Sequence, residues 1–123
     1  MNNDFVDQFE SLPNVPIVQK LYDFYRTFHN FLGKFPKSEK YTLGQNIGSY
    51  ALKTIEEIFT ASTAREGKRA KLVMASTKLD LIKLMVRLAY DTKCIDQNGY
   101  IELQKQLQEI GKMLGGWIRS LSD

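Results

Sequence analysis

Apolar side chains recur along this chain at steps of three and four residues, the spacing that places them on one face of a helix. The first such set predicts a helix with Pro16 in its first turn, where the missing N–H is no loss. Gly33 and Pro36 are predicted to end it. The expected buried residues of this helix are Ile17, Leu21, Phe24, Phe28, Phe31 and Phe35. The chain is expected to divide into a flexible N-terminal arm, residues 1–15, and a helical domain, residues 16–123.

The second predicted helix begins between Ser38 and Thr42. Thr42 and Gln45 have the spacing of a capping box, in which each side chain would bond a backbone N–H at the start of the helix. Ser38 is the alternative cap. The expected buried residues that follow are Ile47, Ala51, Ile55 and Ile58. The pattern fades within residues 60–64.

A turn at residues 65–67 leads to a third predicted helix, which is expected to stop near Cys94. Its predicted buried face consists of Leu72, Ala75, Leu79, Ile82, Val86 and Ala89. Asp96 is a good N-cap for a fourth helix. The predicted buried face of that helix consists of Leu103, Leu107, Ile110, Leu114, Trp117 and Leu121. Short connections between long helices favour antiparallel neighbours, so the sequence predicts an all-α fold, an antiparallel up-down four-helix bundle.

Two adjacent glycines, Gly115 and Gly116, interrupt the fourth predicted helix, although each costs a helix interior about 1 kcal/mol relative to alanine. The apolar spacing does not slip across them, since Leu114 and Trp117 stay on the stripe begun by Leu103. We therefore expect the helix to continue, with the missing Cβ atoms allowing another backbone to approach closely. A frayed end that starts at Gly115 is the alternative.

Composition is ordinary for a soluble globular protein, with 43% hydrophobic and 25% charged residues. No apolar run approaches the roughly 20 residues that cross a membrane. The N-terminus lacks the basic start and apolar stretch of a signal peptide. Cys94 is the only cysteine, so no internal disulfide forms, and a reducing, cytoplasmic environment is expected.

Positive charge is concentrated away from the start of the chain. Residues 1–19 hold three acidic side chains and no Lys or Arg, whereas the remainder holds 17 basic and 11 acidic ones. The densest positive region is residues 65–93, with eight basic and three acidic side chains. This excess favours a polyanion or an acidic protein surface as partner. Solubility alone is the alternative explanation.

The basic residues also sort onto helical faces when each residue advances by about 100°. On the third predicted helix, four of them lie beside the apolar stripe: Arg65, Arg69, Lys83 and Arg87. On the fourth, three at seven-residue spacing lie opposite the apolar stripe: Lys105, Lys112 and Arg119. Like charges four residues apart mildly destabilise a helix, so their repetition suggests an external use. We predict that these residues contact nucleic acid or an acidic partner.

Catalysis is not expected. The only histidine, His29, and the only cysteine, Cys94, belong to different predicted elements, whereas a nucleophilic pair needs hydrogen-bond contact. Neither the Glu-x-x-His motif of di-iron bundles nor a P-loop is present. The sequence therefore predicts a protein that is not an enzyme and that has no metal and no cofactor.

Two segments carry a family resemblance. Residues 35–45, FPKSEKYTLGQ, follow the first predicted helix, and residues 109–117, EIGKMLGGW, lie in the fourth, with a further match in residues 81–89. Across about residues 16–121 the chain resembles the Avd-like four-helix bundle family. This family includes the accessory variability determinant proteins of diversity-generating retroelements and proteins encoded in intervening sequences of bacterial ribosomal RNA. Its motif and packing positions fall on Pro36, Ser38, Tyr41, Leu43, Gly44, Gln45, Gly115, Gly116 and Trp117.

The resemblance implies a bundle that assembles into a homopentameric barrel with positive surfaces. It also implies an accessory role, in which the protein binds RNA or DNA with weak sequence preference. It further implies that the protein binds a reverse transcriptase and supports mutagenic cDNA synthesis, while the polymerase does the chemistry. No membrane partner is expected. The intervening-sequence relatives leave an alternative, a self-assembling module with a structural or protein-interaction role.

Overall fold

The computed structural model describes residues 15–121, and every regular element in that range is helical. The elements are α2 (Val15–Leu32), α3 (Lys37–Glu39), the π-helix η1 (Lys40–Gly44), α4 (Gln45–Thr63), α5 (Lys68–Asp91) and α6 (Gln97–Ser120). The predicted arm lies outside the described residues except for Val15, which begins α2. None of these helices has the length and apolarity that a membrane crossing requires.

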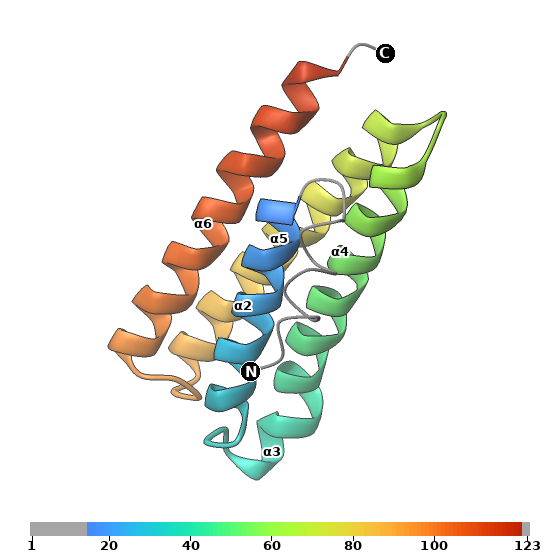
Figure 1. The fold of residues 1–123 in the computed structure, drawn as a ribbon. Helices are drawn as coiled ribbons and strands as arrows, with labels where there is room; N and C mark the ends of the chain where they lie inside the picture. Colours follow the sequence, from blue (N-terminus) through green and yellow to red (C-terminus); the bar gives the residue numbers. More distant parts are fainter. Residues whose placement is uncertain (1–14, 122–123) are drawn as a thin grey trace, which may run out of the picture.

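The four long helices lie side by side and form a bundle (Figure 1). Contacts join α2 to α4, α4 to α5, α5 to α6 and α6 to α2, so successive helices are neighbours and α2 and α5 lie diagonally opposite each other. Short connections reverse the chain each time. Within residues 15–121, this arrangement confirms the predicted up-down four-helix bundle.

Most of the core is made by the residues that the apolar spacing selected, and it also includes Val18, Ala61 and Ile95, which the spacing did not select. Each predicted core residue is buried or partly buried, and the fully buried large side chains include Phe24 and Phe28 of α2 and Leu107 of α6. Phe31, Ile55, Trp117 and Leu121 are the predicted core residues that stay partly exposed. Burying apolar side chains of this size contributes about 1.5–3 kcal/mol each, which explains why the spacing alone predicted the fold.

The second helix starts earlier than the predicted capping box. Helical structure begins at Lys37, directly after Pro36, and continues through η1 into α4. The Thr42 hydroxyl donates to the Ser38 carbonyl oxygen at 3.3 Å and to that of Glu39 at 3.5 Å. The capping-box prediction is therefore wrong, because Thr42 lies within helical backbone and its hydroxyl binds the preceding turn instead of capping.

The third helix begins later than was assumed when Arg65 was placed on its basic face. Gly67 has φ +71°, in the left-handed region that glycine adopts most easily, and α5 begins at Lys68. Arg65 consequently lies in the turn and not on the helix. Its placement on one face with Arg69 by helical spacing is therefore wrong.

The fourth helix confirms two predictions and contradicts a third. The Asp96 carboxylate accepts a hydrogen bond from the Gly99 N–H at 2.8 Å, so Asp96 is the N-cap. The helix runs through Gly115 and Gly116 to Ser120, and no fraying starts at Gly115. Among the described residues, however, a Cβ atom at either glycine would meet only the Arg119 side chain within 4 Å. Within residues 15–121, no other backbone makes the predicted close approach to these glycines.

The surface of α5 carries a second apolar stripe, which the sequence reading did not identify. Val73, Met74, Leu84 and Leu88 are between 41% and 64% exposed. Advancing about 100° per residue places them on the side of α5 away from its buried residues. From Val73 to Leu88 the stripe is about 22 Å long at 1.5 Å per residue. The stripe consists of two exposed apolar pairs, Val73 with Met74 and Leu84 with Leu88, and exposed apolar side chains grouped on one helix face are typical of an interaction surface.

Candidate nucleic-acid interface

The seam between α5 and α6 brings basic side chains of both helices together. A hollow of about 320 Å³ lies in it, lined by Lys83 from α5 and Lys112 from α6 together with the small residues Ser76 and Gly111. Asp80 is the acidic residue of this lining, and its Oδ1 lies 3.7 Å from the Lys83 Nζ. The hollow therefore carries two ammonium groups and one carboxylate, a net positive charge.

Contacts from α6 hold Lys83 at the seam. A Cβ atom at Gly111 would lie 3.2 Å from the Lys83 Nζ and 3.6 Å from Leu79 Cδ2, so the ammonium lies close over the bare backbone of α6. About two turns earlier on α6, Gln104 donates from its Nε2 to the Lys83 carbonyl oxygen at 3.0 Å. The Lys83 backbone is thus bonded to α6 from within a regular helix, and its position does not depend on a flexible loop.

Arg87 lies at the end of the seam nearest the connection between α5 and α6. Its Nε donates to the two carboxylate oxygens of Asp91 at 3.1 and 3.2 Å. Its guanidinium carbon lies 6.0 Å from the Tyr90 ring centre and 5.8 Å from that of Tyr100, within cation–π distance. Hydrogen bonds to Tyr100 and then to Asp91 raise the pKa of Arg87 above its ordinary value. The guanidinium therefore stays charged, although Asp91 offsets part of that charge.

The other end of the seam holds further arginines. Arg65 and Arg69 line a hollow of about 640 Å³ at the turn before α5, and Leu121 reaches the same hollow from the end of α6. The Arg119 Nη1 lies 3.2 Å from the position that a Cβ of Gly115 would occupy. The guanidinium of Arg119 therefore lies over the bare backbone of its own helix.

Lys105 is exposed and does not line the hollow that holds Lys83 and Lys112. On the other side of α6, Glu109 pairs with Lys20 of α2 at 2.8 Å. The hydrogen bond and charge of Lys20 lower the pKa of Glu109, and Lys105 and Lys112 lower it further by smaller amounts. Lys105 lies about 40° from Glu109 around the helix and about 100° from Gln104. It lies on the outer face of α6, only about 20° around the helix from Lys112.

The structure thus brings most of the predicted contact residues into one row along the α5–α6 seam. That row comprises Arg69, Lys83, Arg87, Lys112 and Arg119. Arg65 lies at its end, in the turn, and Lys105 lies on the outer face of α6 without lining the hollow. Within residues 15–121, no carboxylate oxygen lies within 4 Å of the charged nitrogens of Arg65, Lys105, Lys112 or Arg119. In the same range, no three His, Cys, Asp or Glu side chains converge as metal ligands would.

Sequence reasoning missed the aromatic pair beside Arg87. The rings of Tyr90 and Tyr100 stack with centres 4.7 Å apart and planes inclined by 24°. The two residues belong to different helices, so their contact depends on how α5 and α6 align along their length. A tyrosine near the end of one helix and another near the start of the next was the available signal.

The motif positions fall into two groups. Leu43 and Gly44 are buried, and a Cβ at Gly44 would collide with the end of Leu32 and lie 3.2 Å from the Phe35 ring. Tyr41 is 66% exposed. Pro36, Ser38 and Gln45 are also exposed, while Gly115, Gly116 and Trp117 are partly buried. The first segment therefore combines a tight contact between α2 and the start of the second helix with an exposed tyrosine.

Comparison with known families agrees with this architecture. The family model described as bAvd-like matches residues 15–121, which is nearly the whole chain. The chain belongs to the bAvd-like family. The match confirms the Avd-like resemblance seen in the two motif segments, and it covers all four long helices of the bundle. No curated protein matched the sequence.

Proposed function

We propose that this bAvd-like protein is a non-enzymatic, cytoplasmic accessory subunit of a diversity-generating retroelement. In this role it binds RNA or DNA, together with a reverse transcriptase, through its positive surfaces and supports mutagenic cDNA synthesis. Family membership supports the accessory role. The observation that carries the nucleic-acid part is the hollow in which Lys83 and Lys112, from two different helices, face the same space.

The chemistry of the α5–α6 seam suits phosphate groups. Lysine and arginine neutralise phosphates and release condensed counterions, which provides affinity without reading sequence. The neutral lining residues Gln108 and Ser76 can donate hydrogen bonds to phosphate oxygens. No described element presents a recognised base-reading motif, so sequence preference is expected to be weak.

Assembly into a homopentamer is the second part of the proposal. A closed ring needs two complementary surfaces on each protomer. The apolar stripe of α5 is a candidate for one of them, because Val73, Met74, Leu84 and Leu88 have no described covering. A ring would repeat the basic seam around its circumference. Several linked sites bind one polyanion more tightly than a single site does.

Salt dependence of RNA binding tests the nucleic-acid part. A fluorescently labelled RNA titrated at two or more salt concentrations should bind with log K falling linearly with log salt concentration. The slope should be about 0.7 for each phosphate contacted on a single strand and about 0.9 on a duplex. Absence of binding at low salt would remove nucleic acid from the proposal.

The apolar stripe also favours a second candidate, a self-assembling module that engages only protein. Under this alternative the protein forms its oligomer but does not bind RNA or a reverse transcriptase. Measurements of mass and of RNA binding on one preparation separate the two candidates. A reverse transcriptase gene and a variable repeat beside this gene would favour the retroelement role.

A further inference from the structure

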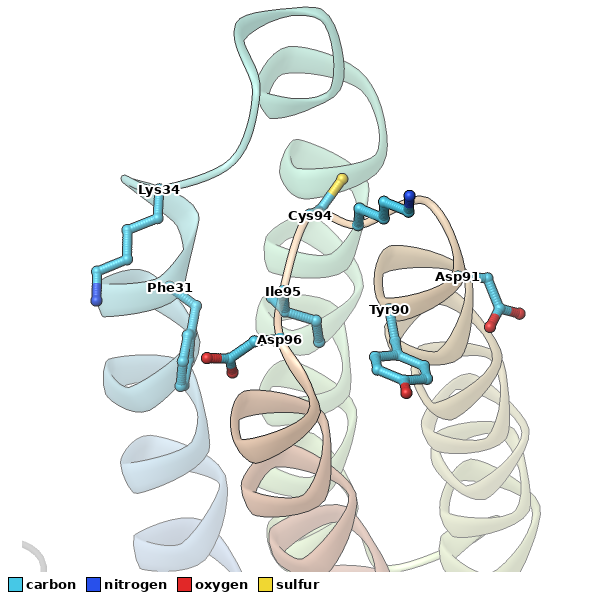
Figure 2. Close-up of a pocket in the computed structure, with 8 residues that line it drawn as sticks. Phe31, Lys34, Tyr90, Asp91, Cys94, Ile95 and Asp96 are labelled. Atoms are coloured by element: carbon cyan, nitrogen blue, oxygen red, sulfur yellow. The ribbon is translucent and has the colours of Figure 1, made fainter.

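The basic seam of α5 and α6 leads to a hollow at the end of the bundle. The hollow has a volume of about 660 Å³ and lies where α2 and α5 end and the chain crosses to α6. Phe31 of α2 and Tyr90 of α5 lie on either side of the connecting residues Ile95 and Asp96 (Figure 2). Two aromatic rings and an aliphatic side chain thus share one open space with two carboxylates, those of Asp96 and of Asp91, which is paired with Arg87.

The aromatic wall is held in place by its neighbours. Tyr90 stacks on Tyr100, with ring centres 4.7 Å apart, and Arg87 lies within about 6 Å of both ring centres. Tyr100 is one helical turn from Gln104, which hydrogen-bonds to the Lys83 carbonyl. Tyr90 of the hollow is therefore in contact with Tyr100, and Arg87 at the end of the basic seam lies beside both rings.

We propose that this hollow binds an unpaired nucleobase of a single-stranded nucleic acid whose backbone follows the seam. The proposal rests on the proposed function, and it narrows the ligand to strands with accessible bases. A base inside a duplex is stacked and paired, so it cannot enter such a space. Bases stack on aromatic side chains with little sequence preference.

The polar residues around the hollow match a nucleotide. Lys34 and Lys93 both line it, both are exposed, and within residues 15–121 neither lies within 4 Å of a carboxylate. They can contact the phosphates on either side of a bound base. Asp96 uses its Oδ1 to accept from the Gly99 N–H, and no described residue donates to its other oxygen. That oxygen can accept from the amino group of cytosine, adenine or guanine.

Two strands of equal charge test the proposal directly. Binding of the full chain to a short fluorescent oligocytidine is compared with binding to an abasic strand of the same length, at low salt. We expect the oligocytidine to bind about tenfold more tightly, the scale of one base stacked on an aromatic ring. In Tyr90→Leu the two strands should bind equally, at the abasic level, while Tyr90→Phe should keep the preference.

Each outcome decides the matter. Equal binding of both strands to the wild-type protein would overturn this site and leave the proposed function standing, whereas no binding of either strand would remove both. A Tyr90→Leu variant that keeps the preference would also overturn the site. If that variant does not fold, photocrosslinking of the wild-type protein to a 5-iodocytidine strand replaces it. The adduct should fall on the peptide that contains Tyr90 or Phe31, and an adduct only elsewhere would refute the proposal.

Discussion

Two glycines of α6 differ in how closely other side chains pack around them, so a change to alanine should have opposite effects on stability at the two positions. At Gly99 a Cβ would lie 2.8 Å from the Phe31 ring, whereas at Gly116 it would lie 3.9 Å from the flexible end of Arg119. Gly116→Ala should therefore raise the free energy of unfolding by about 0.5–1 kcal/mol, the helix preference of alanine. Gly99→Ala should lower it by about 1–3 kcal/mol through overpacking. Urea denaturation measures both. Destabilisation by Gly116→Ala would show that a close neighbour covers this glycine.

The Glu109–Lys20 pair gives a prediction in pH. Because Lys20 lowers the pKa of Glu109, this carboxylate stabilises the folded state at pH values above its unfolded pKa. The contribution is lost as the pH falls through the folded pKa. In Lys20→Met the Glu109 pKa should rise toward the ordinary value of about 4.3. An NMR titration of the Glu109 carboxyl group measures this, and an unchanged pKa would show that the ion pair does not persist in solution.

For single residues, the sequence predicted which basic side chains are exposed but not which side chains contact one another. Lys105, Lys112 and Arg119 are exposed, as their helical positions require. The stacking of Tyr90 on Tyr100 could not be predicted, because it depends on the alignment of two helices and on side-chain rotamers. Burial follows from periodicity along one helix, whereas a contact across a seam does not.

At the scale of elements, the start of the second helix shows where sequence signals compete. Thr42 and Gln45 have the spacing of a cap, yet helical backbone already begins at Lys37. The buried residues Leu43 and Gly44 lie in the π-helical segment. Gly44 packs against Leu32 and Phe35 across the turn between helices. The local spacing does not encode this tertiary contact. Helical structure is present on both sides of Thr42 and Gln45.

The start of α6 is a case in which the local signal decides. Asp96→Ala removes the side chain that accepts from the Gly99 N–H and should lower the free energy of unfolding by about 1 kcal/mol. Asn98 is exposed in the same turn, and Asn98→Ala should change it by less than about 0.5 kcal/mol. Thermal or urea unfolding compares the two variants. Equal effects would contradict the capping role.

At the scale of the whole molecule, the bundle could be predicted but its outer surface could not. The buried stripes of α2, α4, α5 and α6 follow directly from apolar spacing. The second stripe on α5 was also present in the sequence, at Val73, Met74, Leu84 and Leu88. It was hidden by the assumption that each helix carries one apolar face. Only the structure shows that these residues lie outside the core of the protomer.

The second stripe yields a prediction about assembly. Leu84 is 64% exposed, so Leu84→Glu should leave the protomer folded. If the stripe packs against another copy, the glutamate places a charge in an apolar contact, and the oligomer should dissociate. Light scattering after size-exclusion chromatography measures the mass, with circular dichroism as the test of folding. Leu84→Met, which keeps an apolar side chain, should assemble normally. An intact oligomer in Leu84→Glu would exclude this stripe from the interface.

We propose that the α5–α6 seam, and not positive charge in general, binds nucleic acid. The most direct test of this proposal compares two variants that each lose two lysines. One is Lys83→Ala with Lys112→Ala, in the seam; the other is Lys53→Ala with Lys71→Ala, on α4 and on the α4-facing side of α5. RNA affinity is measured over a range of salt concentrations. We predict that the seam variant loses affinity and that its salt slope falls by about 1.4, two single-strand phosphate contacts, while the other variant stays close to wild type. Equal losses in both variants would contradict the account.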